Sequence, residues 1–150
     1  MLSQQEFLAV VKNTPLVAID LVVRSSANQI LMGKRVNEPA AGYWFVPGGR
    51  IFKLETLAEA FRRITQSELG QARNIEDGEL LGAFTHIYDS NFARQPGIST
   101  HYVVLAYRLK LDLALENLPR QQHAGYRWFS GDYDLAEVHP NSRAYFPCLK

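Results

Sequence analysis

The apolar run LVAIDLVVR at positions 16–24 limits the fold more than any other feature of the sequence. Successive side chains of a strand point to opposite faces, and here both alternating sets of positions are mostly apolar. The run therefore predicts a central strand that is buried on both faces. A turn at 25–28 and the segment QILMGKR at 29–35 predict the second strand of a hairpin.

Four more segments have the character of strands, and loops separate them. These strands are predicted at 43–47, 79–88, 99–111 and 126–129. The loops are predicted at 36–42, 89–97 and 115–125, and the last of them holds a dense set of polar groups, His123 included.

Three helices are expected around these strands. Ser3 and Glu6 match a capping box at the start of the first helix, and the residues NTP at 13–15 end it. Thr56 can cap a second helix that Gly70 stops, and between them apolar residues recur at helical spacing: Leu57, Phe61, Ile64 and Leu69. A last short helix is expected near Ser142. This order predicts an α/β or α+β fold in one domain over 1–150, with one main sheet and flanking helices.

Composition excludes several classes of function. The 150 residues carry a formal net charge of +1, whereas a general nucleic-acid surface needs a basic excess. The single cysteine, Cys148, can form neither an internal disulfide nor a zinc site. The N-terminus lacks the features of a signal peptide, and no apolar run is long enough to cross a bilayer. We therefore expect a cytoplasmic protein that binds neither nucleic acid nor membrane.

The segment GGRIFKLETLAEAFRRITQSELG at 48–70 carries the chemistry of the chain. Its glycine pair follows a strand, so the backbone there can closely approach a phosphate or a metal ion. Positions 64, 67 and 68 are three and four residues apart and share one helix face. This face carries Ile64, Ser67 and Glu68, hence a single carboxylate.

The spacing of Gly49, Glu55, Arg63, Glu68 and Gly70 resembles the Nudix box, GX5EX7REUXEEXGU with U aliphatic. Two glutamates of the box are replaced here by isoleucine and serine, and its last aliphatic position is glutamine. The same losses are typical of one Nudix subfamily, the GDP-mannose mannosyl hydrolases. The resemblance covers nearly the whole chain, through NTPL (13–16), MGKR (32–35), GYWFVPGGR (42–50), the helix segment at 55–70, STHYVVL (99–105), QHxxYRW (122–128) and NSRAYF (141–146).

The resemblance implies a Nudix fold, in which a mixed β-sheet is sandwiched between α-helices. It also implies hydrolysis of GDP-mannose, and of GDP-glucose, by attack of water on the anomeric carbon with inversion. The products are GDP and the free hexose, in the setting of cell-surface polysaccharide synthesis. One Mg²⁺ per subunit is implied, with Glu68, the carbonyl of Gly48 and Gln122 as ligands, and the subunits are expected to form a homodimer.

The family also suggests roles around the substrate. His123, beside the expected ligand Gln122, is expected to act as the general base, because an imidazole can take up a proton at neutral pH. Asp20 and Tyr102 are expected to contact the sugar and the phosphates, and Arg35 and Arg50 to stabilise the departing GDP. Two further residues, Leu2 and Phe7, are expected to contribute to the guanine pocket.

Several of these roles have structural alternatives. Asp20 could be a paired structural carboxylate, Phe7 could be core packing, and Arg63 could form a surface ion pair with Glu59. Lys34 and Arg35 alternate along a strand, so only one of them is expected to face a ligand. Two other histidines, His86 and His101, are expected to make structural hydrogen bonds.

Two alternative functions are consistent with the same residues. A conventional Nudix pyrophosphohydrolase would give GMP and a sugar phosphate, but it would lack two box glutamates. A non-catalytic nucleotide-sugar-binding module would keep the fold and bind without turnover.

Overall fold

The structure is a computed structural model that describes residues 1–120, 123–130 and 135–149. Its strands are β1 (Leu16–Arg24), β2 (Ile30–Arg35), β3 (Trp44–Phe45), β4 (Gly48–Arg50), β5 (Glu79–Tyr88), β6 (Thr100–Lys110) and β7 (His123–Phe129). Its α-helices are α1 (Gln4–Asn13), α2 (Leu57–Leu69) and α3 (Pro140–Arg143), and short 3₁₀ helices cover Ile75–Asp77, Leu115–Asn117, Leu135–Glu137 and Phe146–Leu149. No helix within these ranges combines the length and apolar character needed to cross a membrane.

Strand β1 lies at the centre of the sheet, as its apolar run predicts. The strand order is β3-β2-β1-β6-β5, with β4 paired to β1 and β7 paired to β2. The β1–β6 pair is parallel and the other pairs are antiparallel. The expected mixed sheet is therefore confirmed.

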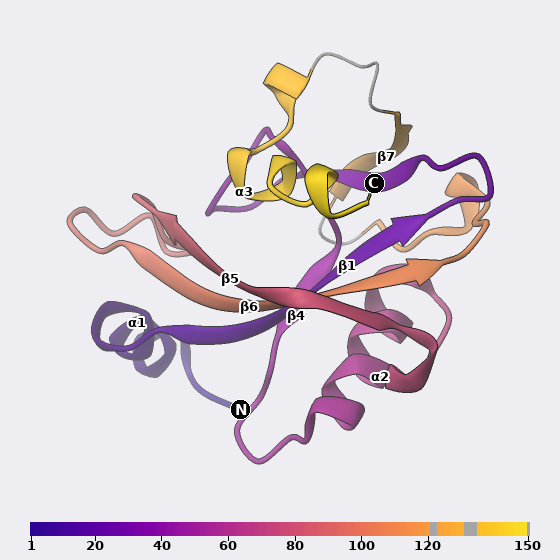
Figure 1. Cartoon of the computed structure of the whole chain (residues 1–150). Coiled ribbons are helices and arrows are strands. Elements are labelled where there is room, and N and C mark those ends of the chain that lie inside the picture. The colour runs from indigo at the N-terminus through magenta and orange to yellow at the C-terminus, as the bar shows by residue number, and fades with distance from the viewer. Residues whose placement is uncertain (121–122, 131–134, 150) are drawn as a thin grey trace.

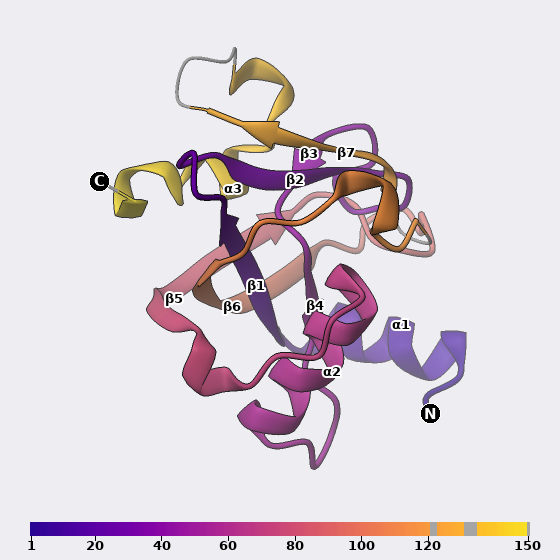
Figure 2. The ribbon, with the colours of Figure 1, turned by 90° about the vertical axis from the view of Figure 1, so that its right-hand side faces the viewer.

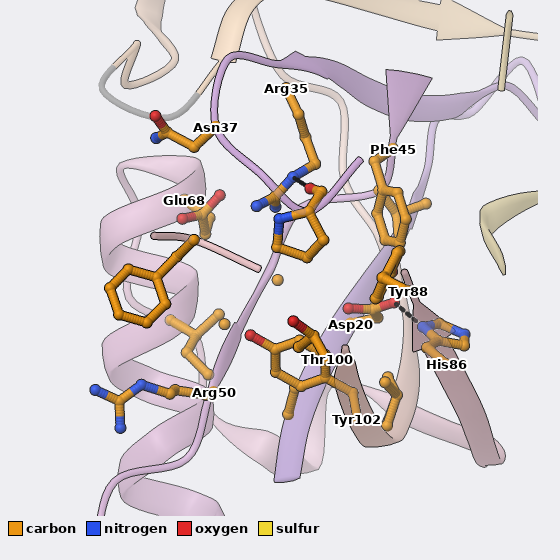
Figure 3. A pocket seen from close by; sticks show the side chains of 18 of the residues that line it. Asp20, Arg35, Asn37, Phe45, Arg50, Glu68, His86, Tyr88, Thr100 and Tyr102 are labelled. Carbon is orange, nitrogen blue, oxygen red and sulfur yellow. Dashed lines mark hydrogen bonds and ion pairs between the residues drawn. The ribbon is translucent and has the colours of Figure 1, made fainter. Parts of the chain in front are cut away.

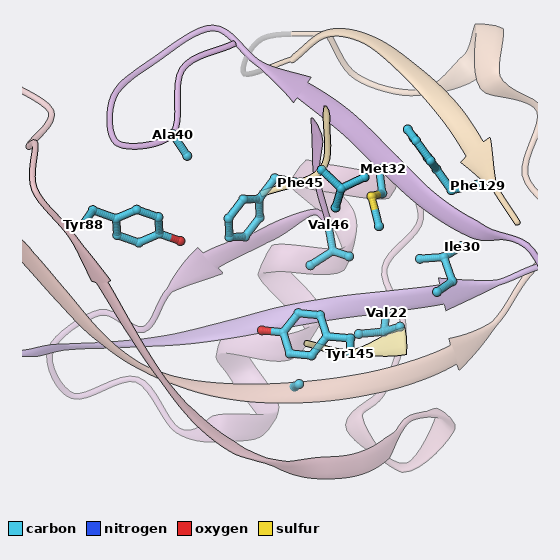
Figure 4. Packing of buried hydrophobic residues seen from close by; sticks show 11 residues of the cluster. Val22, Ile30, Met32, Ala40, Phe45, Val46, Tyr88, Phe129 and Tyr145 are labelled. Atoms are coloured by element: carbon cyan, nitrogen blue, oxygen red, sulfur yellow. The ribbon is translucent and has the colours of Figure 1, made fainter. Parts of the chain in front are cut away.

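Helices cover the two faces of this sheet (Figure 1, Figure 2). On one face α2 packs its Phe61 and Ile64 against Ile19, Leu21 and Val23 of β1. On the other face, α3 and the C-terminal segment enclose a second cluster that contains Val22, Met32, Phe45, Val46, Phe129 and Tyr145 (Figure 4). Strand β1 therefore contributes side chains to two hydrophobic clusters, one on each face of the sheet. Full burial of one such large apolar side chain stabilises the fold by about 1.5–3 kcal/mol.

The helix boundaries follow local capping signals. Ser3 and Glu6 form a reciprocal capping box on α1, in which Ser3 N donates to Glu6 Oε2 at 2.7 Å. Thr56 and Glu59 form the same arrangement on α2, and Gly70 ends this helix in the left-handed region with φ of 73°. These expected starts and stops are confirmed.

Strand β1 changes partner along its length, and this opens the sheet. Its early residues pair with β4 through Ala18↔Arg50 and Asp20↔Gly48, whereas it meets β2 only at Arg24↔Ile30. The far end of β2 pairs instead with β3 and β7. The end of β2 therefore diverges from the start of β1.

One predicted boundary is wrong. His123 opens β7 instead of lying in a loop, because it pairs with Arg35 of β2 across a register shift in the ladder. The short helix expected near Ser142 is confirmed: it begins at Pro140, where the His139 side chain accepts a hydrogen bond from Asn141 N and caps it.

Candidate active site

A cavity of about 460 Å³ lies where β1 and β2 diverge, a volume suited to a small-molecule ligand. Strands β1, β4, β5 and β6 contribute to its walls, as do α1, α2 and the β2–β3 loop. Figure 3 shows Glu68 on the α2 side, Asp20 and His86 on the opposite side, and Arg35 projecting between them. The other lining residues include Phe7, Asn37, Glu38, Gly48, Arg50, Phe52, Arg63, Ser67, Tyr88, Phe92 and Tyr102.

Gly48 brings the backbone of β4 against Asp20. A Cβ added at Gly48 would lie 2.5 Å from Asp20 Oδ1 and 2.6 Å from the Ile19 carbonyl oxygen, so no larger residue fits. In the antiparallel ladder, Leu21 N donates to the Pro47 carbonyl and Ile51 N to the Val17 carbonyl. Hydrogen-bonded and non-hydrogen-bonded pairs alternate, so the pair Asp20↔Gly48 is of the second kind. The Gly48 carbonyl therefore points away from β1.

The α2 wall presents one carboxylate to the cavity. Glu68 lines the cavity and is 5% exposed, whereas Ile64 is fully buried in the core beneath it. A Cβ at Gly49 would lie only 3.3 Å from Ile64 Cγ1, so this helix position packs against the glycine pair. Ser67 donates its hydroxyl proton to the Ile64 carbonyl at 3.2 Å. The two positions that lack a glutamate are thus used for packing and for a helix hydrogen bond.

His123 contacts Glu68 from the side of β7. Its Nε2 lies 3.4 Å from Glu68 Oε2, and both side chains are buried. The ring packs flat against β2, where a Cβ at Gly33 would lie 2.4 Å from Nδ1. Within the described residues Nδ1 has no hydrogen-bond partner, and His123 is not among the residues that line the cavity. Gln122, the third predicted metal ligand, lies outside the described residues.

Asp20 is a buried carboxylate with neutral partners. The Tyr145 hydroxyl donates to its Oδ2 at 2.5 Å, and His86 Nδ1 lies 4.0 Å from the same oxygen. Burial raises the pKa of Asp20 to about 7, although the Tyr145 hydrogen bond and the positive charge of Arg35 act in the opposite direction. Burial likewise lowers the pKa of His86 to about 4, so this imidazole is neutral near pH 7.

Arg35 and Arg50 bring positive charge to the cavity wall. Arg35 lines the cavity and its Nε donates to the Pro39 carbonyl at 2.9 Å, whereas Lys34 is exposed. The expectation that only one of this pair faces a ligand is consistent with that arrangement. Arg50 lies between two aromatic rings, 4.3 Å from the Phe7 centroid and 4.9 Å from the Phe52 centroid.

Arg63 holds the loop that precedes α2. Its guanidinium donates to Glu55 at 2.6 and 2.9 Å and to the Arg50 carbonyl at 2.9 Å. The alternative of a surface ion pair with Glu59 is wrong, because Glu59 is used to cap Thr56. Arg63 therefore fixes the backbone that carries Arg50.

Of the three other residues predicted to bind the substrate, Phe7 and Tyr102 line the cavity and Leu2 does not. Phe7 lines the cavity and packs against Phe92, with ring centroids 4.8 Å apart and planes tilted by 34°. Leu2 is 46% exposed and does not line the cavity in this chain. Tyr102 lines it, and burial raises the pKa of its hydroxyl above the ordinary value.

Some residues of the cavity were not predicted to belong to a site. The structural hydrogen bond expected of His86 is present, with the Tyr145 hydroxyl at 3.3 Å, but His86 also lines the cavity, which the sequence did not indicate. Tyr88 and Phe92 also line the cavity, and alternation along β5 places His86 and Tyr88 on one face. Tyr145 carries no local signal, because its partner is 125 residues away.

The arrangement has features that fit one hard cation. Glu68 supplies a carboxylate and Gly48 a carbonyl that points away from β1, and Mg²⁺ commonly combines one or two carboxylates with water and phosphate oxygens. Among the described residues no group of three or more His, Cys, Asp or Glu side chains could hold a metal ion. This donor set suits a single ion better than a cluster of ions.

Comparison with known proteins agrees with the fold and the box. The NUDIX domain model matches residues 14–146. The chain is 42% identical over 146 residues to the low-salt glycan biosynthesis protein Agl8 of Haloferax volcanii, covering 96% of this chain and 88% of that protein.

Two solved structures share the fold. The MutT protein of Methanosarcina mazei Go1 has a TM-score of 0.69 at 18% identity, covering 91% of this chain and 94% of that one. A MutT NUDIX hydrolase from Burkholderia pseudomallei has a TM-score of 0.67 at 26% identity, covering 91% and 97%. With a family model matched over most of its length and a close relative, this chain belongs to the NUDIX family.

Proposed function

We propose that this Nudix hydrolase cleaves a GDP-hexose, GDP-mannose or GDP-glucose, into GDP and the free hexose. Water attacks the anomeric carbon and the configuration inverts. The observation that carries this proposal is the α2 face, on which Glu68 is joined by a buried Ile64 and a helix-bonded Ser67. A helix face with one carboxylate compensates the charge of one divalent ion and not that of several.

The metal ion would be held by Glu68 and the Gly48 carbonyl, with Gln122 as the third ligand expected from the family resemblance. When bound, Mg²⁺ would supply Lewis-acid stabilisation of the diphosphate leaving group. The rest of the chemistry is assigned to side chains of this chain.

Departure of GDP transfers negative charge to the diphosphate, so cations at the cavity wall favour the reaction. Arg35 and Arg50 line the cavity, and the neutral Tyr102 hydroxyl can donate a hydrogen bond to a phosphate oxygen. Pro39 and the two aromatic rings around Arg50 limit the freedom of these guanidinium groups. Both cations are thus held in place before the charge develops.

The anomeric carbon becomes positively charged in an oxocarbenium-like transition state. Asp20 lines the opposite side of the cavity, and its negative form would stabilise this charge. His123 is the proposed base for the attacking water. That role requires the water to reach Nε2 beside Glu68, where the two side chains already meet at 3.4 Å.

The guanine base is assigned to the α1 end of the cavity. Phe7 and Phe92 offer aromatic surface there, which suits a purine. The role of Leu2 and the homodimer remain part of the proposal by family resemblance. The name of the Haloferax volcanii relative, a protein of low-salt glycan biosynthesis, supports a role in sugar-nucleotide metabolism for surface polysaccharides.

Product analysis tests this function. Purified protein is incubated with GDP-mannose, and in parallel with GDP-glucose, with and without Mg²⁺, and followed by ³¹P NMR. GDP with free hexose is the expected result. GMP with hexose 1-phosphate would instead identify a pyrophosphohydrolase, and binding without turnover at any Mg²⁺ concentration would identify a binding module.

A further inference from the structure

The Asp20 carboxylate has two oxygen atoms in different surroundings. Oδ2 accepts the 2.5 Å hydrogen bond from Tyr145, a length typical of a charge-assisted O–H···O bond. Oδ1 lies against Gly48, and within the described residues no hydrogen bond to it is formed. One oxygen is therefore fixed by the protein, and the other is left at the cavity wall.

Tyr145 reaches Asp20 from outside the cavity. Its side chain is fully buried in the cluster under α3 and does not line the cavity. Its ring packs edge to face on Phe84, with centroids 5.0 Å apart and planes at 87°. In Figure 4 it lies beside Val22 of β1, the strand that also carries Asp20.

Hydrogen bonds to the β3 region hold the segment that carries Tyr145. His139 N donates to the Trp44 carbonyl at 3.0 Å, and Val46 N donates to Ser142 Oγ at 3.1 Å. Tyr145 N in turn donates to the Ser142 carbonyl at 3.1 Å. Because the backbone of this segment is held and the ring is rigid, the position of the Tyr145 hydroxyl is fixed.

We propose that Tyr145 is a positioning residue, which fixes the orientation of the Asp20 carboxylate so that Oδ1 is directed to the reacting sugar. A buried carboxylate with no strong donor could rotate about its Cβ–Cγ bond, and among the described residues the other polar group near Oδ2 is His86 Nδ1, at 4.0 Å. Small errors of orientation at a reacting carbon lower the rate strongly. The inference rests on the proposed function, in which Asp20 stabilises the anomeric carbon.

The first test is the variant Tyr145→Phe, which keeps the buried ring and removes only the hydroxyl. We expect kcat for GDP-hexose hydrolysis to fall by roughly 10–100-fold, with KM changed by less than about threefold, as for loss of one buried hydrogen bond. The matched control is Tyr107→Phe. Tyr107 is also buried, but it packs on Phe61 at the opposite face of the sheet, so kcat should not change.

A double-mutant cycle separates positioning from a merely structural role. If Tyr145 acts through Asp20, Tyr145→Phe should have no further effect on kcat in the Asp20→Asn background. An equal loss of kcat in both backgrounds, or an unchanged kcat in Tyr145→Phe alone, would overturn the inference.

A measurement on the protein without substrate keeps the two proposals apart and does not depend on the folding of a variant. The short hydrogen bond should give a far-downfield hydroxyl proton in the ¹H NMR spectrum of the wild type, and this signal should be lost in Asp20→Asn. Its absence in the wild type overturns the positioning role, whatever the activity. A wild type with the signal but without release of GDP and hexose overturns the proposed function instead.

Discussion

On the α2 wall of the cavity, Glu68 stands beside a buried isoleucine and a serine bonded to its own helix. On the β1 wall, Asp20 is enclosed by the neutral partners Tyr145 and His86. The first wall lacks the density of negative charge that several metal ions require, and the second holds a buried carboxylate between neutral polar partners at the edge of the same cavity. Among the described residues, acidic groups therefore lie on both walls, and no group of three or more potential metal ligands forms a cluster.

The two walls suit different electrostatic roles, the binding of a cation and the stabilisation of positive charge on carbon. A carboxylate next to a backbone carbonyl suits the binding of a cation that neutralises phosphates. A buried carboxylate opposite suits the stabilisation of positive charge on carbon, because the low dielectric of a buried site strengthens the interaction. The comparison of the walls thus favours chemistry at the sugar over chemistry at phosphorus.

The largest effect is expected from His123→Gln, which removes the proposed base beside the α2 wall. We expect kcat to fall by about 10²–10⁴-fold with a modest change in KM, as for loss of a general base. Steady-state kinetics with GDP-mannose measures it. His101→Gln is the matched control, since His101 lies in β6 and does not line the cavity; an unchanged kcat in His123→Gln would exclude the role of base.

Next comes Glu68→Gln, which removes the carboxylate of the α2 wall and keeps its shape. The Mg²⁺ concentration needed for half-maximal activity should rise by roughly 10–100-fold, because a neutral amide binds a hard cation more weakly. A Mg²⁺ titration of the rate measures this. Glu76→Gln, at an exposed glutamate, should leave the titration unchanged, and the same curve for Glu68→Gln and wild type would remove Glu68 from the metal site.

A smaller effect is expected on the pH dependence of the free energy of unfolding. Asp20 and His86, the two buried titratable groups of the β1 wall, change this free energy in opposite directions as the pH changes. Burial raises the pKa of Asp20 from 3.8 to about 7, so its contribution to stability is present at low pH and is lost as the pH rises to about 7. Burial lowers the pKa of His86 from 6.5 to about 4, so its contribution is present above 6.5 and is lost as the pH falls to about 4. In the wild type the two contributions offset each other between pH 4 and 7.

Single variants should expose each contribution. Between pH 7 and pH 4, the free energy of unfolding of Asp20→Asn should fall more steeply than that of the wild type. Over the same interval, the free energy of unfolding of His86→Gln should change in the opposite direction relative to the wild type. Urea unfolding at several pH values, followed by tryptophan fluorescence, measures these slopes. Three equal slopes would contradict the burial of this pair as the cause.

The smallest effect is expected from Ser67→Glu, which restores one box carboxylate to the α2 wall. The products should remain GDP and hexose, because Ile64 is still apolar and the groups around the leaving group are unchanged. Chromatography of the nucleotide products measures the outcome. A switch to GMP would show that one carboxylate at this position decides the reaction.

Local signals were sufficient for much of the fold. The apolar run at 16–24 gave the bounds of β1. The Ser3–Glu6 capping box and the residues NTP at 13–15 gave the limits of α1, and Thr56 and Gly70 gave those of α2. The box residues identified the α2 wall, because the spacing between them is fixed within one loop and one helix. These features depend on neighbours in the sequence.

The β1 wall depends on contacts between residues that are far apart in the sequence, and no local pattern predicts them. Tyr145 and His86 reach Asp20 only because β1 pairs with β6, β6 pairs with β5, and the C-terminal segment packs under α3. The start of β7 was missed for the same reason, since His-Ala-Gly has weak strand propensity and its pairing with β2 decides the conformation.

The most direct test of the central claim, attack of water on carbon, uses one turnover of GDP-mannose in H₂¹⁸O with Mg²⁺. The products are analysed by mass spectrometry at times short enough to limit exchange of the sugar's anomeric oxygen with water. We predict ¹⁸O in the released hexose and none in GDP. Label in a phosphate group of the nucleotide or of a sugar phosphate would contradict the claim.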